Sequence, residues 1–394
     1  MGRRTHKKVE LEATVLDASR ERFRELFRRF DKVAVSFSGG KDSTVCLNLA
    51  LEAAHAAGRL PLDVYFWDEE AIHPETVEYV ERVASRPDVA LKWLCIPVQH
   101  RNACSRAEPY WYPWDPAKRH LWVRPMPASA ITELAGFTPG MTIPDLAHLV
   151  YGPEHGTVAD VRGLRADESL RRRRAVSQRV ADNWITSGRA GYSYACSPIY
   201  DWNTVDVWTA PREFGWDYNR AYDVMALAGV APNRQRVCPP YGEEPLGNLW
   251  LYSVCWPDLW HKMLARVEGA ATAARYARTE LYGFGKIALP AGLTWQQYTF
   301  RQLNLWPNEY RATIAASLQR LLAEHKSKTN RPVPEDAADR LSGLSWRFLA
   351  NIAARGDLKG RRGGKVLEYA RAARERSGET MEQVIAEETD DDRY

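Results

Sequence analysis

The run Ser38-Gly39-Gly40-Lys41-Asp42-Ser43 combines the residue types of a phosphate-binding loop. The two glycines allow a tight bend in which free N–H groups point at an anion, and Lys41 adds a full positive charge. The hydroxyl groups of Ser38 and Ser43 can donate hydrogen bonds to phosphate oxygens. Asp42 is unexpected in an anion site, and a structural role or magnesium binding would explain it. The run therefore predicts a polyphosphate site.

A strand and a helix must hold this loop in place. The β-rich run Val33 to Ser38 leads directly into the pair Gly39-Gly40, and a helical stretch follows from about residue 43 to residue 57. Further strands are expected at residues 62–67, 89–96 and 158–161, with a helix that begins at Pro74. Strands that alternate with helices at this spacing predict an α/β fold, with a parallel sheet flanked by helices.

The remaining chain suggests additions to this domain. Residues 1–30 carry an amphipathic lead-in helix, and residues 31–230 make up the nucleotide-binding domain. Its long insertion at residues 100–157 is rich in Trp, Tyr and Pro, and we expect a functional role for it. Residues 231–394 are mainly helical and end in an acidic tail. The boundary near residue 230 is soft.

Composition excludes several classes of protein. With 45% hydrophobic and 26% charged residues in 394, the chain matches an ordinary globular protein with a full core. No apolar run approaches a membrane span, and the basic start lacks the apolar region of a secretory signal. We therefore expect a cytoplasmic protein without membrane contact. Basic clusters such as Arg171–Arg174 are read either as solvated surface or as phosphate contacts.

The six cysteines show no CxxC spacing, which argues against a zinc ribbon or a redox pair. Reduced thiols are the favoured interpretation. An iron–sulfur cluster is a weaker hypothesis, and its ligands would be Cys104, Cys196, Cys238 and Cys255.

The loop resembles the pyrophosphate loop of the N-type ATP pyrophosphatases, also called PP-loop proteins. Three further segments are similar to the phosphoadenosine phosphosulfate (PAPS) reductase branch of that superfamily. They are Phe66-Trp67-Asp68 with His73-Pro74-Glu75-Thr76, the stretch Arg162-Gly163-Leu164-Arg165-Ala166-Asp167-Glu168-Ser169, and the stretch from Ser197-Pro198-Ile199 through Asp201-Trp202 to Asp206-Val207-Trp208. The resemblance implies the adenine nucleotide alpha hydrolase-like, Rossmann-like fold for residues 33–210.

Segments beyond this range resemble a co-activator subgroup called immunoglobulin-binding regulator A. They are residues 219–223, residues 236–242, Thr294-Trp295 and residues 344–347. In that subgroup the gene often neighbours a ParB-like protein, which implies such a partner.

The loop, Asp68 and Arg162–Ser169 each follow an expected strand, so they can converge at the carboxyl edge of the sheet, where open parallel sheets bind ligands. Arg162 and Arg165 are planar donors suited to phosphate or sulfate oxygens. The proposed catalytic residues are Lys41, Asp42 and Asp68, and Asp42 is the candidate metal ligand. The expected nucleotide-binding residues are Ser36, Ser38, Gly39, Gly40, Lys41, Asp42, Ser43, Asp68, Arg162, Gly163, Arg165, Glu168 and Ser169.

The resemblance implies that ATP, with Mg²⁺, is cleaved between its α and β phosphates and that an acceptor is adenylated. The first alternative is a regulator that senses a nucleotide without turning it over. A PAPS reductase is disfavoured, because no cysteine follows Cys255 to act as its nucleophile. In a further hypothesis the acceptor is DNA or RNA, gripped by the basic helical part and its tryptophans, which are otherwise expected to pack in a core.

Overall fold

The computed structural model describes the chain at residues 12–169, 172–173, 176, 184–188, 190–238, 240–242, 246, 249–276, 287–358, 360, 363, 366–378, 380 and 383–384. It divides into two compact units. The first comprises Met1–Asn102, Tyr110–Pro245 and Leu249–Glu268, and the second comprises Ala103–Pro109, Leu246–Asn248 and Gly269–Tyr394. None of the described helices has the length and apolar character that a membrane span requires.

The first unit contains a six-stranded sheet in the order β3-β2-β1-β6-β8-β7. Only β7 runs antiparallel to its neighbour, so the predicted parallel sheet is confirmed. The strands are β1 (Lys32–Ser36), β2 (Leu62–Trp67), β3 (Val89–Leu94), β6 (Val158–Arg162), β7 (Ile185–Ser187) and β8 (Ser193–Cys196). In the register, Ser36 lies opposite both Tyr65 and Arg162, which brings the carboxyl ends of the three central strands to one edge.

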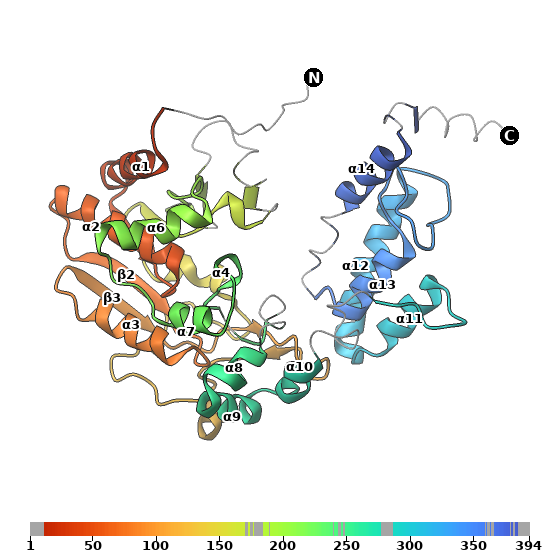
Figure 1. Ribbon diagram of the computed structural model, residues 1–394, viewed down its shortest axis with the longest axis horizontal. Coiled ribbons are helices and arrows are strands. Elements are labelled where there is room, and N and C mark those ends of the chain that lie inside the picture. Colours follow the sequence, from red (N-terminus) through yellow and green to blue (C-terminus); the bar gives the residue numbers. More distant parts are fainter. Residues whose placement is uncertain are drawn as a thin grey trace. The chain divides into compact units, whose positions relative to one another are not determined.

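The two faces of the sheet contribute to two different core clusters. Because side chains alternate along a strand, Val33 and Val35 of β1 join one core cluster and Ala34 joins another. The first cluster includes residues of three helices, α1 (Val15–Arg29), α2 (Lys41–Ala56) and α3 (Pro74–Ala84) (Figure 1). The second cluster is completed by Leu146, Val150 and Tyr151 of the insertion.

The aromatic insertion is a folded part of the protein with short elements. These are β4 (His100–Arg101), β5 (Tyr110–Trp111), the 3-10 turns η1 (Pro116–Leu121), η2 (Ala147–Leu149) and η3 (Pro153–His155), and α4 (Ile143–Leu146). Residues 103–109 within it belong to the second unit. The first unit is completed by η4 (Ala166–Glu168), α6 (Thr204–Phe214), α7 (Ala221–Leu227), η5 (Pro232–Arg234), α8 (Trp250–Cys255) and α9 (Pro257–Arg266).

The described part of the second unit is helical, as the sequence predicted. Its helices are α10 (Ala270–Tyr276), α11 (Trp295–Asn304), α12 (Asn308–Lys326), α13 (Trp346–Arg355) and α14 (Val366–Ser377). Trp295 and Trp306 are buried in its core, and the Trp306 indole donates to the Ala353 carbonyl oxygen over 2.7 Å. These rings pack helices together, so they offer no open face on which a nucleic-acid base could stack.

Candidate functional site

The Ser38–Ser43 loop joins the end of β1 to the start of α2. Gly39 adopts a φ of +68°, and a Cβ atom there would lie 3.0 Å from the Thr76 Cγ2 atom, so the position suits only glycine. The Ser43 hydroxyl accepts from the Ser38 backbone N–H over 3.2 Å and donates to the Gly40 carbonyl over 3.0 Å. These bonds hold the bend in one shape at the positive end of a 16-residue helix.

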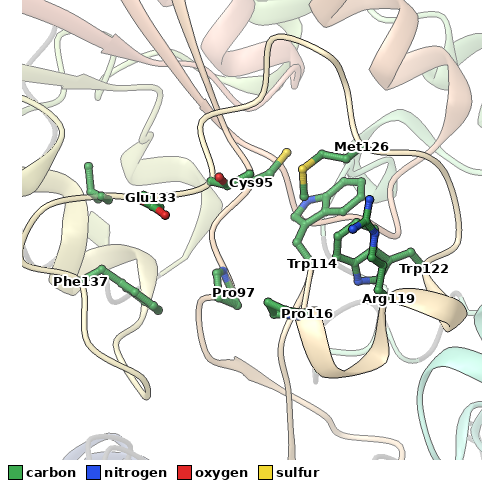
Figure 2. Close-up of a pocket in the computed structure, with 11 residues that line it drawn as sticks. Cys95, Pro97, Trp114, Pro116, Arg119, Trp122, Met126, Glu133 and Phe137 are labelled. Atoms are coloured by element: carbon green, nitrogen blue, oxygen red, sulfur yellow. The ribbon is translucent and has the colours of Figure 1, made fainter.

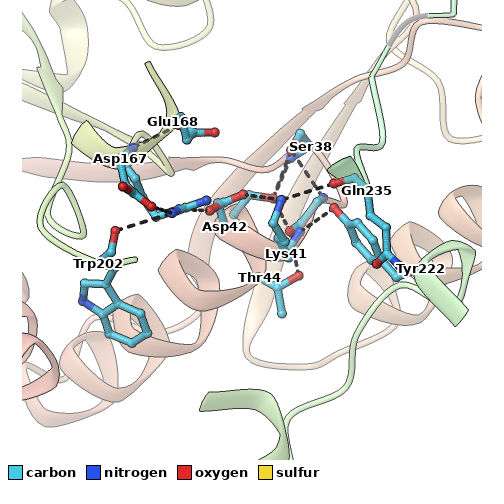
Figure 3. A network of polar contacts seen from close by, with 12 residues as sticks. Ser38, Lys41, Asp42, Thr44, Asp167, Glu168, Trp202, Tyr222 and Gln235 are labelled. Carbon is cyan, nitrogen blue, oxygen red and sulfur yellow. Dashed lines mark hydrogen bonds and ion pairs between the residues drawn. The ribbon is translucent and has the colours of Figure 1, made fainter. Parts of the chain in front are cut away.

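A chain of charges crosses the start of α2 (Figure 3). The Lys41 ammonium lies 3.2 Å from one Asp42 carboxylate oxygen, and the Arg165 guanidinium pairs with the other. Arg165 is only 3% exposed. Burial lowers the pKa of Lys41, and the Asp42 carboxylate opposes this shift. Asp42 therefore holds two cations beside the loop. This structural role explains why a carboxylate is present in an anion site.

Gly163 places the segment after β6 directly against the loop's helix. A Cβ atom at Gly163 would lie 2.8 Å from the Asp42 carbonyl carbon and 2.9 Å from the Ser43 nitrogen. Only glycine allows this approach, because both contacts are with backbone atoms that cannot turn away. The close approach explains how Arg165, two residues later, reaches Asp42.

We expect Gly163→Ala to destabilise the chain by about 1–3 kcal/mol, because an added methyl group overpacks the backbone of α2. Urea unfolding measures this difference. Gly191→Ala is the matched control, since a Cβ atom there meets nothing within 4 Å. Equal stability of the two variants would contradict the assigned contact.

Two later segments also lie on the loop. The Asn219 amide donates to the Gly39 carbonyl over 2.9 Å and to the Thr76 hydroxyl over 2.8 Å. The Tyr222 hydroxyl accepts from the Lys41 backbone N–H over 3.0 Å, and the Gln235 carbonyl lies 3.5 Å from the Lys41 ammonium (Figure 3). Sequence reasoning noted residues 219–223 as a similar segment but missed their place at the site. No local pattern could have placed them there, because Asn219 lies just before α7 and Tyr222 lies within it, far along the chain from the loop.

Several expected binding residues lie beside the loop and hold one another. Arg162 donates to Asp160 over 2.7 Å, and Asp160 also accepts from the Tyr65 hydroxyl. Glu168 accepts from the Arg165 backbone N–H over 3.1 Å and pairs with Arg172. Two expected serines make local contacts. Ser36 contacts the Tyr65 hydroxyl, and the Ser169 hydroxyl accepts from the Arg172 backbone N–H. Arg171 and Arg174 of the basic run lie outside the described residues.

Asp68 is placed at the end of β2, within a buried network. Its carboxylate accepts from the Trp93 indole over 2.7 Å and from the Glu70 backbone N–H over 2.9 Å, and it pairs with Arg124. Among the described residues, no hydrogen bond or ion pair joins Asp68 to the Ser38–Ser43 loop. The structure thus shows Asp68 as an anchor for the insertion, and its catalytic role stays a prediction.

Glu69, the next residue, has a carboxyl group with a raised pKa. Burial and the neighbouring Asp68 raise the pKa of Glu69 to about 8, and the His100 Nε2 atom lies 3.2 Å from it. The folded chain therefore keeps a proton that the unfolded chain releases near the ordinary value of 4.5. The stability that this proton contributes is complete below that value and is lost as the pH rises through about 8.

We expect Glu69→Gln to remove this part of the pH dependence, because an amide does not titrate. Between pH 5 and pH 9 (roughly the window of the raised pKa), the variant should lose less stability than the unsubstituted chain in urea unfolding. Glu78→Gln, on the exposed side of α3, should leave the dependence unchanged. A Glu69→Gln curve parallel to that of the unsubstituted chain would show that Glu69 is ionised in the folded state.

The segment at residues 197–208 braces the fold. Asp201 accepts two hydrogen bonds from Arg22 of α1, at 2.8 and 2.7 Å, and the Trp202 indole donates to the Ser19 hydroxyl over 2.8 Å. Asp206 forms a capping box with Asn203 at the start of α6. These contacts show that Asp201 and Trp202 brace the fold and that Asp206 caps a helix.

Metal-binding side chains do not gather within the described ranges, where no group of three or more His, Cys, Asp or Glu residues could hold an ion. The four cysteines considered for a cluster form no disulfide in the part of the chain that the structure describes. Cys104 and Cys196 are buried, whereas Cys238 and Cys255 are partly exposed. Burial raises the pKa of Cys196 and Cys255.

Two family models match the chain. Residues 32–225 match the phosphoadenosine phosphosulfate reductase domain, and residues 229–351 match a domain of unknown function, DUF3440. Among solved structures, the PAPS reductase of Candida auris is 18% identical and covers 55% of this chain and 94% of its own, with a TM-score of 0.33. An FMN adenylyltransferase of Candida glabrata, solved with FMN and the ATP analogue AMPCPP, is 13% identical and covers 52% and 58%, with a TM-score of 0.30.

A curated relative spans both matched regions. The uncharacterized protein YbdN of Escherichia coli (strain K12) is 35% identical over 373 residues, which are 89% of this chain and 90% of that protein. With its PAPS reductase domain and its loop between β1 and α2, the chain belongs to the YbdN family within the PP-loop, adenine nucleotide alpha hydrolase-like superfamily.

Proposed function

We propose that the chain binds ATP, or a related sulfonucleotide, at the Ser38–Ser43 loop and cleaves it between the α and β phosphates to adenylate an acceptor. The observation that carries this proposal is the Lys41–Asp42–Arg165 chain, which holds two cations beside a glycine bend at a helix N-terminus. Such an arrangement stabilises a polyphosphate anion through N–H groups and full charges together. The match to the PAPS reductase domain also supports a nucleotide as the ligand.

In this reaction an oxygen of the acceptor attacks the α-phosphorus. The bond from the α-phosphorus to the bridging oxygen breaks, pyrophosphate leaves, and any proton on the acceptor oxygen passes to solvent. The loop N–H groups and Lys41 would neutralise the charge that develops on pyrophosphate. Lys41 can turn toward this anion because Asp42 keeps Arg165 as a partner.

Magnesium fits this site in a limited way. Mg²⁺ commonly binds one or two protein carboxylates together with substrate phosphates. Asp42 is the carboxylate at the loop, and Mg²⁺ would have to replace its contact with Lys41. When bound there, the ion would add positive charge against the leaving pyrophosphate.

A second candidate function is nucleotide sensing without turnover, in a co-activator of the regulator A type with a ParB-like partner. The contacts of Tyr222 and Gln235 favour it, because they use the Lys41 N–H and ammonium groups that a phosphate would also use. Nucleotide binding would then move residues 219–237, and a partner protein could read that movement.

The test is to measure ATP binding by calorimetry and pyrophosphate and AMP release with radiolabelled ATP. The assays should include small hydroxy and carboxylic acids, DNA and RNA as acceptors. Acceptor-dependent pyrophosphate release supports adenylation, and tight binding without release supports sensing. Sulfite release from PAPS with a thiol reductant would instead indicate a reductase. Absence of nucleotide binding would overturn both proposals.

A further inference from the structure

The nucleotide loop is contacted by a segment that lies outside the PAPS reductase match. That match ends at residue 225, and the DUF3440 match begins at residue 229. The Gln235 carbonyl lies 3.5 Å from the Lys41 ammonium, and a Cβ atom at Gly40 would lie 3.3 Å from the Val237 Cγ2 atom. The residues on both sides of Arg236 therefore lie against the loop.

This segment is held firmly in place. The Gln235 side-chain amide donates to the Val230 carbonyl over 2.8 Å, and Gln235 is only 4% exposed. The Val237 backbone N–H faces the Tyr222 hydroxyl, which also accepts from the Lys41 backbone N–H over 3.0 Å (Figure 3). A binding group on a backbone fixed in this way loses little conformational freedom when it meets a ligand.

The Arg236 side chain adds a positive charge near the loop. Burial lowers the pKa of Lys41, and the charges of Arg165 and Arg236 lower it further, against the opposing effect of Asp42. The cations repel one another, and a phosphate bound among them would turn this repulsion into attraction. Arg165 is buried, whereas Arg236 is exposed and can meet a ligand that enters from solvent.

The aromatic hollow of the insertion does not supply such a charge to the loop. Its volume is about 490 Å³, and its lining residues lie between Cys95 and Phe137, with Trp122 and Met126 among them (Figure 2). Arg119 is the single cation of this lining, and no lining residue belongs to the loop. The hollow is therefore set apart from a polyphosphate on the loop.

We propose that Arg236 binds the polyphosphate of the nucleotide, so that the DUF3440 region supplies a side chain to the site. Its planar guanidinium can donate two parallel hydrogen bonds to phosphate oxygens, a geometry that a lysine ammonium does not offer. During cleavage it would stabilise, together with Lys41, the negative charge on the leaving pyrophosphate. This role of Arg236 rests on the proposed nucleotide function and extends the site beyond the PAPS reductase domain.

The first test measures binding of inorganic pyrophosphate to variants of the full chain by calorimetry. Arg236→Met should weaken this binding about 10- to 100-fold, the usual cost of losing a hydrogen bond between charged groups. Arg234→Met is the matched control, because Arg234 is also exposed and has no hydrogen bond or ion pair to the loop among the described residues. It should bind pyrophosphate as the unsubstituted chain does. Equal affinity of the two variants would overturn the proposal.

A second measurement needs no substitution, so it does not depend on how a variant folds. Phenylglyoxal modifies exposed arginines, and mass spectrometry gives the rates at Arg236 and Arg234 separately. With pyrophosphate at about ten times its Kd, modification of Arg236 should slow about tenfold, and that of Arg234 should not change. Where calorimetry shows pyrophosphate bound, equal slowing at both residues or at neither would overturn the role of Arg236 and leave the nucleotide proposal standing. If the unsubstituted chain binds no pyrophosphate, the nucleotide proposal itself fails, and the role of Arg236 with it.

Discussion

Replacing Lys41 by methionine is expected to reduce pyrophosphate release from ATP by about 100- to 1,000-fold, the usual cost of losing one electrostatic contact in a transition state. Lys41 is the lysine at the loop, and its ammonium can turn from Asp42 toward a phosphate. The same variant should weaken binding of inorganic pyrophosphate in calorimetry, which gives a readout that does not depend on the acceptor. The substitution should not unfold the chain, because Asp42 keeps Arg165.

Lys32→Met is the matched control. Lys32 begins β1, at the opposite end of the same strand, and pairs with Asp63 over 2.7 Å. Its removal changes net charge by the same amount and should leave pyrophosphate binding and release unchanged. If the two variants bind pyrophosphate equally well, the polyphosphate does not lie on the Ser38–Ser43 loop.

The sequence was sufficient for features that depend on neighbouring residues. β-rich runs of residues predicted β1, β2 and β3, and the pair Gly39-Gly40 before Lys41 predicted the bend at the start of α2. These features arise from local sterics and burial, which a short stretch of sequence contains. The sequence did not predict that Gly163 lies against the backbone of Asp42 and Ser43. It showed only that Gly163 belongs to the segment 162–169, which is similar to the PAPS reductase branch.

The partners of the loop could not be predicted in the same way. Asn219 and Tyr222 lie 180 and 181 residues beyond the loop atoms that they contact. Contacts at such distances depend on how the whole sheet and its helices pack, and no local pattern contains that information. The same limit applied to Asp68, whose place after β2 was expected but whose carboxylate turns to Arg124 and Trp93.

A buried ion pair between Glu70 and Arg266 links the two family regions. Glu70 follows β2 in the PAPS reductase region, and Arg266 ends α9 in the DUF3440 region. Arg266 donates to both carboxylate oxygens of Glu70, at 2.8 and 2.9 Å, and to the Tyr112 carbonyl over 2.6 Å. The two charged side chains are 2% and 0% exposed. Residues beyond 229 thus complete the first unit.

We expect Arg266→Met to destabilise the protein by about 3–5 kcal/mol, because it leaves the Glu70 carboxylate buried without its counter-ion. Urea unfolding, with a probe that reports on the first unit, measures the loss. Arg82→Met removes a similar pair with Asp217 that is 42% exposed on each side, and it should cost only about 0.2–1 kcal/mol. Adding Glu70→Gln to Arg266→Met removes the unpaired charge and should recover part of the loss. If the single Arg266 variant were as stable as the Arg82 variant, the buried pair would not join these regions.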